Sequence, residues 1–239
     1  DTGMHRLGFE ADTIQELIQT LKGNQRVLVK SILSHMATSD ASEHKDFSLS
    51  QIRLFDAMSN QLMNELSIQP LRHILNTSGI SNFPEGQYDM VRLGIGLYGV
   101  SNDAEEQKYL ENVSTLKSVI SQIRTVPAGD SVGYGRRFMA AKPTVVATIP
   151  IGYADGISRL WGNGSGYVTV NKQKAIILGS VCMDMLMVDV TGIDCSEGDD
   201  VIVFGESPKV IEIAEKTQTI PYEILTSISQ RVKRVFYRE

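Results

Sequence analysis

The spacing of apolar residues along the first part of the chain predicts two amphipathic helices. In residues 13–23, TIQELIQTLKG, isoleucine and leucine recur every three or four residues, which places them on one helix face. Thr13 and Glu16 occupy the positions of a capping box, and Gly23 follows as a stop signal. A second helix is predicted over residues 48–66, where isoleucine, phenylalanine and leucine again form one stripe.

Apolar runs beside these helices predict strands. RVLVKSILSHMA begins at residue 26, and RHILNTSG and MVRLGIGLYG follow the second helix. The first and last of these runs are apolar almost throughout, so we expect both faces of the strands to be covered, as in parallel sheets. Strand, helix and strand at this spacing predict a parallel α/β sheet.

The pattern changes near residue 109, which we take as a domain boundary. From there on, runs of β-branched residues are separated by turns rich in Gly, Asp and Pro, and one short helix is predicted near residues 209–217. The basic run RVKRVFYR near the C-terminus alternates with apolar residues and is interpreted as a strand with one wet face. The predicted fold class is α/β plus β, with an α/β domain over 1–108 and a mostly antiparallel β domain over 109–239.

Composition narrows the classes of function. The net charge of −5 and the isoelectric point near 5.5 argue against nucleic-acid binding, because that requires clustered Lys and Arg. No apolar run approaches the roughly 20 residues of a membrane-spanning helix, so no membrane partner is expected. Cys182 and Cys195 do not suggest a disulfide framework and match no zinc spacing. We therefore expect a reduced, cytoplasmic protein without a bound metal.

Polar residues at strand ends are the candidates for chemistry, because parallel α/β folds build their sites there. His35 ends the first predicted strand and can be either a structural or a functional residue. The segment NTSG, residues 76–79, can be a plain turn or a phosphate cradle. Arg92 lies inside an apolar run, and because a buried guanidinium needs an acceptor, we favour a functional role for it.

The predicted β domain holds a second group of candidates. Tyr134 lies between two glycines in SVGYGRRF, which can be an ordinary hairpin turn or a functional position. The segments IGYADG and SVCMDM interrupt apolar strands with Tyr153, Asp155, Cys182 and Asp184. Cys182 needs no function, since a buried thiol packs as a small hydrophobe. The methionines at 183, 185 and 187 are expected only to pack.

Together these segments resemble bacterial alanine racemases, which are pyridoxal-phosphate enzymes. The resemblance covers essentially the whole chain. It is specific, because the decarboxylases of the same fold carry an acidic residue toward the pyridine nitrogen and lack GYADG and CMDM. The matching segments occur in the order and approximate spacing of the family: DTGMHRLGF, SHMATSD, NTSG, MVRLGIGLYG, SVGYG, IPIGYADG, CMDM and IPYEILTSISQRVKR.

The resemblance implies the C-terminal part of a (β/α)8 barrel followed by a β domain. It also implies a homodimer in which each active site is completed by the partner's β domain. The implied reaction interconverts L- and D-alanine and supplies D-alanine for peptidoglycan. Two bases on opposite faces of the α-carbon are required, because a proton must leave one face and return to the other.

The same resemblance implies a role for each site residue. Arg92 would face the pyridine nitrogen of pyridoxal 5′-phosphate, and Tyr134 would be one of the two bases, linked to Arg92 through His35. Arg6 and the backbone N–H of Met183 would receive the substrate carboxylate. The cofactor phosphate would be held by Thr77, the backbone of Gly94 and Ile95, and Tyr222.

The family's second base is the lysine that also carries the cofactor, and it has no counterpart here. In relatives it lies in a segment like VKANAYGHG, and no lysine of this chain occurs in such a context. The position of a carbamylated lysine, two residues before DTG, is also absent. We therefore expect a chain that begins midway through the barrel and is inactive alone. Two smaller departures are Thr77 in place of Ser, and Ser180 where some relatives have Arg.

Two alternative functions stay open. The chain can be a non-catalytic dimerisation or interaction module in which the barrel portion is only structural. It can also belong to a racemase of another small amino acid, such as serine. A reading frame that contains the cofactor lysine would separate the first alternative from alanine racemisation, and a substrate panel would settle the second.

Overall fold

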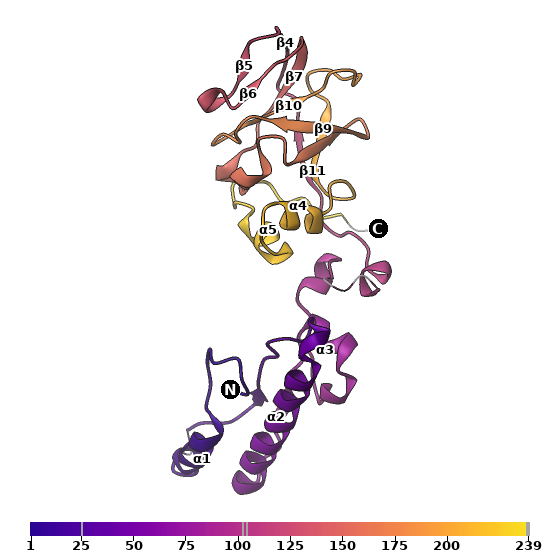
Figure 1. Cartoon of the computed structure of the whole chain (residues 1–239). Helices are drawn as coiled ribbons and strands as arrows, with labels where there is room; N and C mark the ends of the chain where they lie inside the picture. The colour runs from indigo at the N-terminus through magenta and orange to yellow at the C-terminus, as the bar shows by residue number, and fades with distance from the viewer. Residues whose placement is uncertain (25, 102, 104, 238–239) are drawn as a thin grey trace. The chain divides into compact units, whose positions relative to one another are not determined.

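The computed structural model describes residues 1–24, 26–101, 103 and 105–237 and divides them into two units, Asp1–Glu111 and Asn112–Glu239. Each cluster of buried hydrophobic side chains lies within one unit. Unit 1 combines helices with a parallel strand pair, and unit 2 is built on a curled antiparallel sheet (Figure 1). The predicted fold class, α/β followed by β, is confirmed.

Unit 1 is built around two helices that pack side by side, α1 (Ile14–Lys22) and α2 (Lys45–Leu66) (Figure 1). Ile14 and Ile18 of α1 are buried with Leu62 of α2, so the apolar stripes predicted from the sequence form the contact. The predicted capping box is wrong. A 3-10 turn, Ala11–Thr13, runs directly into α1, so Thr13 already has helical dihedral angles and its hydroxyl donates to the carbonyl of Glu10.

The strands of unit 1, β1 (Ser31–Leu33) and β2 (Leu71–His73), pair in parallel, as predicted. The expectation of a long strand covered on both faces is wrong. Leu33 and Leu71 are 58% and 51% exposed, whereas Ile32 packs into the core. Side chains alternate along a strand, so in β1 only the face that carries Ile32 meets the core.

The run over residues 90–99 was expected to be a strand, and this prediction is also wrong. Arg92 donates its backbone N–H to the carbonyl of Leu75, but the segment then turns at Gly94 and continues as the 3-10 turn Ile95–Tyr98. The NTSG segment starts the short helix α3 (Thr77–Asn82), and the side chain of Asn76 caps it by accepting from the N–H of Gly79. The NTSG segment therefore follows closely on β2, and the backbone of Arg92 is hydrogen-bonded to Leu75, just beyond the end of that strand.

Within the described residues, unit 2 contains a seven-stranded sheet in the order β3-β11-β8-β9-β10-β7-β4, with every neighbour antiparallel. The end strands β3 and β4 are consecutive in the chain, so the sheet curls around one core of valine and isoleucine side chains. A small hairpin joins β5 and β6. The strands are β3 (Leu116–Val119), β4 (Gln122–Val126), β5 (Ser131–Val132), β6 (Phe138–Met139), β7 (Thr144–Ile149), β8 (Tyr167–Val170), β9 (Gln173–Leu178), β10 (Leu186–Asp189) and β11 (Asp200–Phe204).

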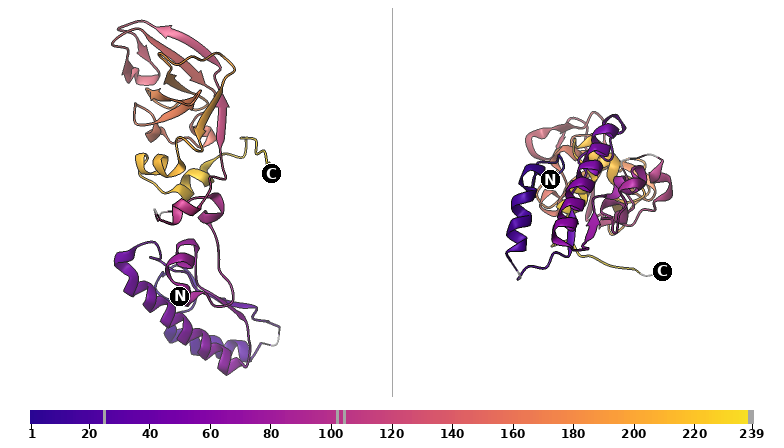
Figure 2. Two further views of the ribbon diagram at one scale, coloured as in Figure 1. Left: turned by 90° about the vertical axis from the view of Figure 1, so that its right-hand side faces the viewer. Right: turned by 90° about the horizontal axis from the view of Figure 1, so that it is seen from below.

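Two helices, α4 (Val210–Lys216) and α5 (Pro221–Ser227), lie next to each other at one end of this sheet (Figure 2). The helix predicted near residues 209–217 is confirmed, whereas α5 was not predicted. The expectation of a strand over RVKRVFYR is wrong for residues 231–237, and Arg238 lies outside the described residues. The Arg231 side chain instead donates hydrogen bonds to Asp155 and Asp184 of unit 2.

Candidate active site

Arg92 is the centre of the candidate site in unit 1. Its Nη2 donates to the carbonyls of Ser34 (2.6 Å) and Ile74 (3.2 Å) and lies 3.2 Å from Nδ1 of His35. Its Nη1 donates to the carbonyl of His73 at 3.3 Å and to Nδ1 of the same residue. Ser34 and His35 follow β1, His73 ends β2 and Ile74 follows it, so the guanidinium joins the carboxyl ends of the two parallel strands.

Burial and the charge of Arg92 together keep both histidines neutral. Burial, followed by the charges of Arg92 and Arg6, lowers the pKa of His35, and burial with Arg92 lowers the pKa of His73. Both imidazoles are therefore neutral at neutral pH. Because each Nδ1 faces an Arg92 donor, the proton is assigned to Nε2 in both rings. The Nε–H of Arg92 donates to no residue that the structure describes, and it is the donor left for a ligand.

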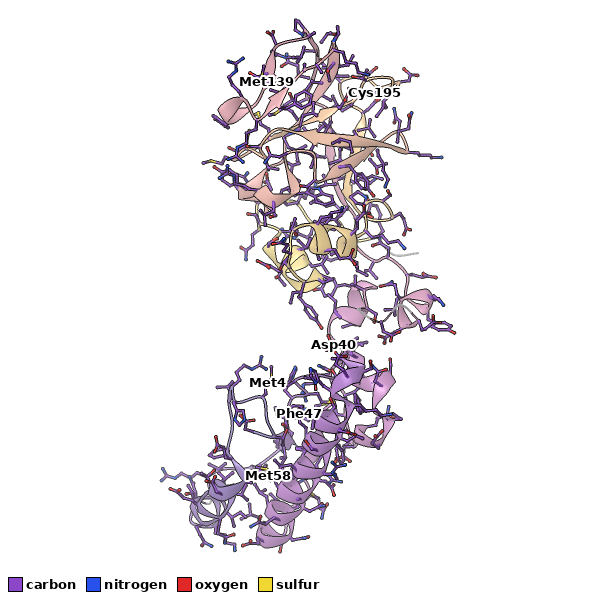
Figure 3. All side chains as sticks on the ribbon, viewed as in Figure 1. Met4, Asp40, Phe47, Met58, Met139 and Cys195 are labelled. Atoms are coloured by element: carbon purple, nitrogen blue, oxygen red, sulfur yellow. The ribbon has the colours of Figure 1, made fainter. Side chains whose placement is uncertain are left out.

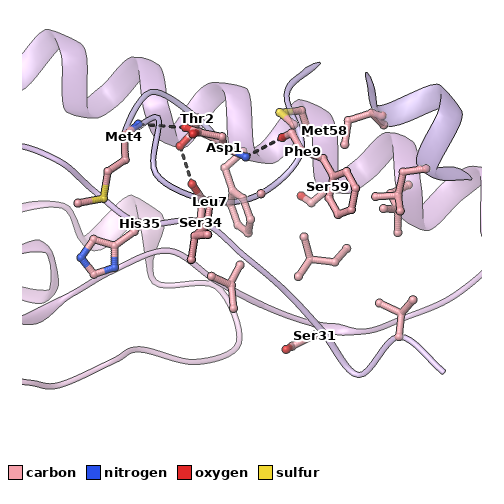
Figure 4. A pocket seen from close by; sticks show the side chains of 18 of the residues that line it. Asp1, Thr2, Met4, Leu7, Phe9, Ser31, Ser34, His35, Met58 and Ser59 are labelled. Carbon is pink, nitrogen blue, oxygen red and sulfur yellow. Dashed lines mark hydrogen bonds between the residues drawn. The ribbon is translucent and has the colours of Figure 1, made fainter. Parts of the chain in front are cut away.

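Gln51, a buried glutamine on α2, supports His35 and the DTG segment. Gln51 is completely buried, and its Oε1 accepts from the backbone N–H of Ala37 at 2.9 Å. Its Nε2 donates to the carbonyl of His35 (3.1 Å) and to the hydroxyl of Thr2 (3.3 Å). The hydroxyls of Thr2 and Ser34 share a hydrogen bond of 2.6 Å (Figure 4). Gln51 thus ties the DTG segment to the end of β1.

Arg6 lies on the loop that follows DTG, and its side chain is exposed. The carboxylate of Asp1 holds this loop by accepting from the backbone N–H groups of Gly3 and Met4 (Figure 4). Gly3 has a φ of 129°, and a Cβ there would come within 2.9 Å of the ring of Phe47 on α2, so glycine is required (Figure 3). The loop, α1, β1 and α2 line an open and mostly apolar pocket of about 460 Å³, with Arg6 and His35 among its lining residues.

Thr77, Gly94 and Ile95 also lie together. Thr77 is buried at the start of α3, and its hydroxyl accepts from the backbone N–H of Gly94 at 2.9 Å. Ile95 begins a 3-10 turn, whose first N–H groups have no acceptor within the helix. Gly96 approaches the same place, since a Cβ there would lie 3.0 Å from Cγ2 of Thr77. The three predicted phosphate ligands of unit 1 are therefore neighbours.

In unit 2 the segments IGYADG and CMDM form one paired structure. The backbone N–H of Tyr153 donates to the carbonyl of Cys182 (2.9 Å), and that of Ala154 donates to the carbonyl of Met183 (3.0 Å). A Cβ on Gly152 would lie 2.3 Å from the carbonyl oxygen of Cys182, so only glycine permits this approach. Burial raises the pKa of the Cys182 thiol, which keeps it protonated.

The methionines of this region do not behave alike. Met183 and Met185 are 54% and 44% exposed, so the expectation that they only pack is wrong, because both lie in the turn before β10 rather than in the strand. Met187, inside β10, packs with Val132 and its neighbours.

Tyr134 and Tyr222 are both exposed on unit 2. Tyr134 lies between β5 and β6, 75% exposed, in a turn where Gly133 and Gly135 have φ angles of 77° and 68°. SVGYGRRF is thus a hairpin turn, and a functional role for Tyr134 within it stays a prediction. Tyr222 lies in the first turn of α5. These residues and Met183 belong to separate segments of unit 2, whereas Arg6, His35, Arg92 and the three phosphate candidates belong to unit 1.

His73 and Gln51 are the functional candidates that the sequence analysis missed. His73 ends β2 and pairs in register with Leu33, so its polar position at a strand end was a usable signal. Gln51 is a single amide next to Ile52 on the buried side of α2 and carried no such signal. No group of His, Cys, Asp or Glu side chains among the described residues could hold a metal ion. None of the helices formed by the described residues is long and apolar enough to cross a bilayer.

Comparison with family models divides the chain in the same way as its fold. The model "Alanine racemase, N-terminal domain" matches residues 1–102, and "Alanine racemase, C-terminal domain" matches residues 113–236. Alanine racemase 2 of Caldanaerobacter subterraneus subsp. tengcongensis is 38% identical over 244 residues, which cover 99% of this chain and 62% of that protein.

Solved structures give the same result. The alanine racemase from D-cycloserine-producing Streptomyces lavendulae matches with a TM-score of 0.92 and 33% identity, over 100% of this chain and 65% of that one. The alanine racemase from Bartonella henselae, solved with covalently bound pyridoxal phosphate, matches with a TM-score of 0.84 and 34% identity, over 99% of this chain and 65% of that one. The chain thus spans less than two thirds of the length of these relatives.

Proposed function

The chain belongs to the alanine racemase family, and from that premise we propose that its residues serve an enzyme that interconverts L- and D-alanine with pyridoxal 5′-phosphate. The observation that carries the proposal is the guanidinium of Arg92, held at the ends of two parallel strands by backbone carbonyls and two neutral histidines. This arrangement leaves one N–H of a partly buried cation for a ligand.

The donors in unit 1 fit pyridoxal phosphate. The free Nε–H of Arg92 suits a single acceptor such as the pyridine nitrogen, and the adjacent cation disfavours protonation of that nitrogen. The hydroxyl of Thr77 and the N–H of Ile95 suit a phosphate, and the N–H of Gly94 would join them by turning away from the Thr77 hydroxyl, its acceptor in this structure. Tyr222 would add a phenolic hydroxyl. When bound, the cofactor withdraws electrons from the α-carbon of the amino acid and so makes its proton acidic.

The remaining residues would bind alanine and move its proton. Arg6 and the N–H of Met183 would bind the carboxylate, and Arg6 suits bidentate binding. Tyr134 would exchange the α-proton on one face. A neutral phenol is a weak base, so Tyr134 would need the positive environment that Arg92 supplies through His35.

The second base would be a lysine in a segment like VKANAYGHG, which these 239 residues do not include. We propose accordingly that the chain alone does not racemise alanine. We further propose a cytoplasmic homodimer in which Tyr134 acts in the partner's site, with D-alanine used for peptidoglycan. These last points rest on the family resemblance.

The test is racemisation by the full reading frame that contains these residues. We expect D-alanine from L-alanine, a loss of at least about 100-fold in Arg92→Gln, as for other lost electrostatic groups in active sites, and no D-alanine from the 239 residues alone. Arg124→Gln is the matched control, because Arg124 is exposed on β4 and its Nη2 donates only to Gln122. No racemisation by an enzyme with bound cofactor would refute the proposal, and serine in the same assay tests the other substrate.

A further inference from the structure

Three segments that are distant in the sequence meet at one place in unit 2. The turn of Gly152–Gly156 pairs with the turn of Cys182–Met185 through the backbone hydrogen bonds described above. The segment after α5 closes on the first turn, since the N–H of Ser229 donates to the carbonyl of Asp155 at 3.0 Å. A Cβ on Gly156 would lie 2.4 Å from the carbonyl oxygen of Ser227, so this contact is also as close as backbone allows.

The side chain of Arg231 joins all three segments. Its Nε donates to Oδ1 of Asp155 at 2.7 Å, and its Nη2 donates to Oδ1 of Asp184 at 2.6 Å. Asp155 is only 8% exposed, and its second oxygen accepts from the N–H of Gly152 at 2.8 Å. The bonds from Arg231 and Gly152 lower the pKa of Asp155, which keeps this buried carboxylate charged. The planar guanidinium of Arg231 thus connects the buried carboxylate of Asp155 with the exposed carboxylate of Asp184.

Contacts on both sides of Met183 fix the turn that carries its N–H. This N–H shares a peptide plane with the carbonyl of Cys182, which accepts from the N–H of Tyr153 at 2.9 Å. Asp184 follows Met183 directly and is held by Arg231, whereas the carbonyl of Met183 is held by Ala154. The N–H of Cys182 donates to the carbonyl of Met185 and closes the turn. The N–H of Met183 donates to no residue in the described part of the chain, so the turn presents a fixed and free donor.

We propose that Arg231 is a positioning residue that orients the Met183 N–H toward the carboxylate of the amino-acid substrate. The proposal rests on the proposed function, in which this N–H binds that carboxylate. Arg231 touches neither the α-carbon nor the cofactor in this proposal. Its loss should therefore weaken substrate binding while leaving the proton-transfer step largely unchanged.

Arg231→Lys tests this in the full-length holoenzyme. Lysine keeps the positive charge beside Asp155, but its single ammonium group cannot reproduce the planar guanidinium. We expect about a tenfold rise in KM for alanine, the effect of one misdirected hydrogen bond, with kcat within about twofold. Asp184→Asn, which keeps an acceptor without the charge, should raise KM by about threefold. The double variant should show less than the product of the two effects.

Arg234→Lys is the matched control, because Arg234 lies in the same segment and donates only to the backbone carbonyls of Ile228, Ser229 and Val232. A KM rise of the same size in this control would overturn the proposal, as would an unchanged KM in Arg231→Lys.

Amide hydrogen exchange of the 182–185 turn supplies a readout that does not depend on activity. It should be about tenfold faster in Arg231→Lys than in Arg234→Lys, as expected when a restraint on one turn is lost. Unchanged amide exchange in Arg231→Lys would refute the positioning role, whatever the activity of the variant. Faster exchange together with an unchanged KM for alanine would refute it as well. Absence of racemisation in the wild-type holoenzyme would instead refute the proposed function, and with it the substrate role of Arg231.

Discussion

Replacement of Gln51 by leucine is expected to destabilise unit 1 measurably. The side chain is completely buried and makes hydrogen bonds to Ala37, His35 and Thr2 at 2.9, 3.1 and 3.3 Å. Loss of three such bonds costs about 2 to 4 kcal/mol at the usual net value for each. Leucine buries more apolar surface than the glutamine methylenes, which offsets about 1 kcal/mol. The expected net loss is about 1 to 3 kcal/mol.

Urea unfolding of the full-length protein, followed by circular dichroism, measures this loss. The midpoint should fall while the slope stays the same, since a change in slope would signal a different unfolding reaction. Gln61→Leu is the matched control on the same helix, because Gln61 is exposed and its bonds to Gln15 and Glu65 are solvent-accessible. We expect the control to lie within about 0.5 kcal/mol of wild type.

The same pair of variants can refute the reasoning. If Gln51→Leu and Gln61→Leu lose equal stability, the buried amide is not a support for the site. Because Gln51 holds the carbonyl of His35 and the hydroxyl of Thr2, Gln51→Leu should also reduce racemisation, whereas Gln61→Leu should not.

Two further predictions concern the histidines and the dimer. His35 and His73 have lowered pKa values in the folded chain, so below their ordinary value of 6.5 the unfolded state binds more protons, and stability should fall as pH drops through 6.5 toward the folded values. The melting temperature from pH 8 to 5 checks this, and a drop that is no smaller in His35→Gln would contradict it. Mixing Tyr134→Phe subunits with subunits that lack the cofactor lysine should restore about a quarter of wild-type activity, because half of the dimers are mixed and each has one whole site. Inactive mixtures with proven heterodimers would exclude a shared site.

Helices were predictable in this chain wherever one face is apolar. The stripes of α1 and α2 give their positions to within a few residues, because tertiary packing uses the same face that the pattern marks. Helix α5 was missed because it spans only Pro221–Ser227 and carries too few apolar positions to show a period. Pro221 at its first position was the available signal.

The strands of unit 1 were less predictable because a strand needs a partner. The run from residue 26 is apolar, but only Ser31–Leu33 pairs with β2. The run from residue 90 contains Gly94, whose φ of −114° and ψ of −100° belong to neither strand nor helix. Hydrophobicity indicated burial in both runs, whereas strand length depends on neighbours that no local pattern specifies.

The site residues also divide into those that the sequence could predict and those that it could not. Arg92 was recognisable, since a cation in an apolar run must find acceptors, and it finds carbonyls at the ends of both strands. Its partner His73 and the support of Gln51 depend on strand register and on which face of α2 is covered. Neither property can be obtained from residues adjacent in sequence.

The motifs of unit 2 show why the resemblance to a family predicted more about the site than the individual residues did. GYADG, CMDM and QRVKR are far apart in the sequence, yet each restricts the others. Gly152 must lack a side chain because the carbonyl of Cys182 lies against it, and Asp155 can stay charged and buried because Arg231 reaches it. A change in any one segment leaves a clash or an unpaired charge in another. The three segments therefore form a single structural constraint, and its chemical result is one oriented N–H, that of Met183.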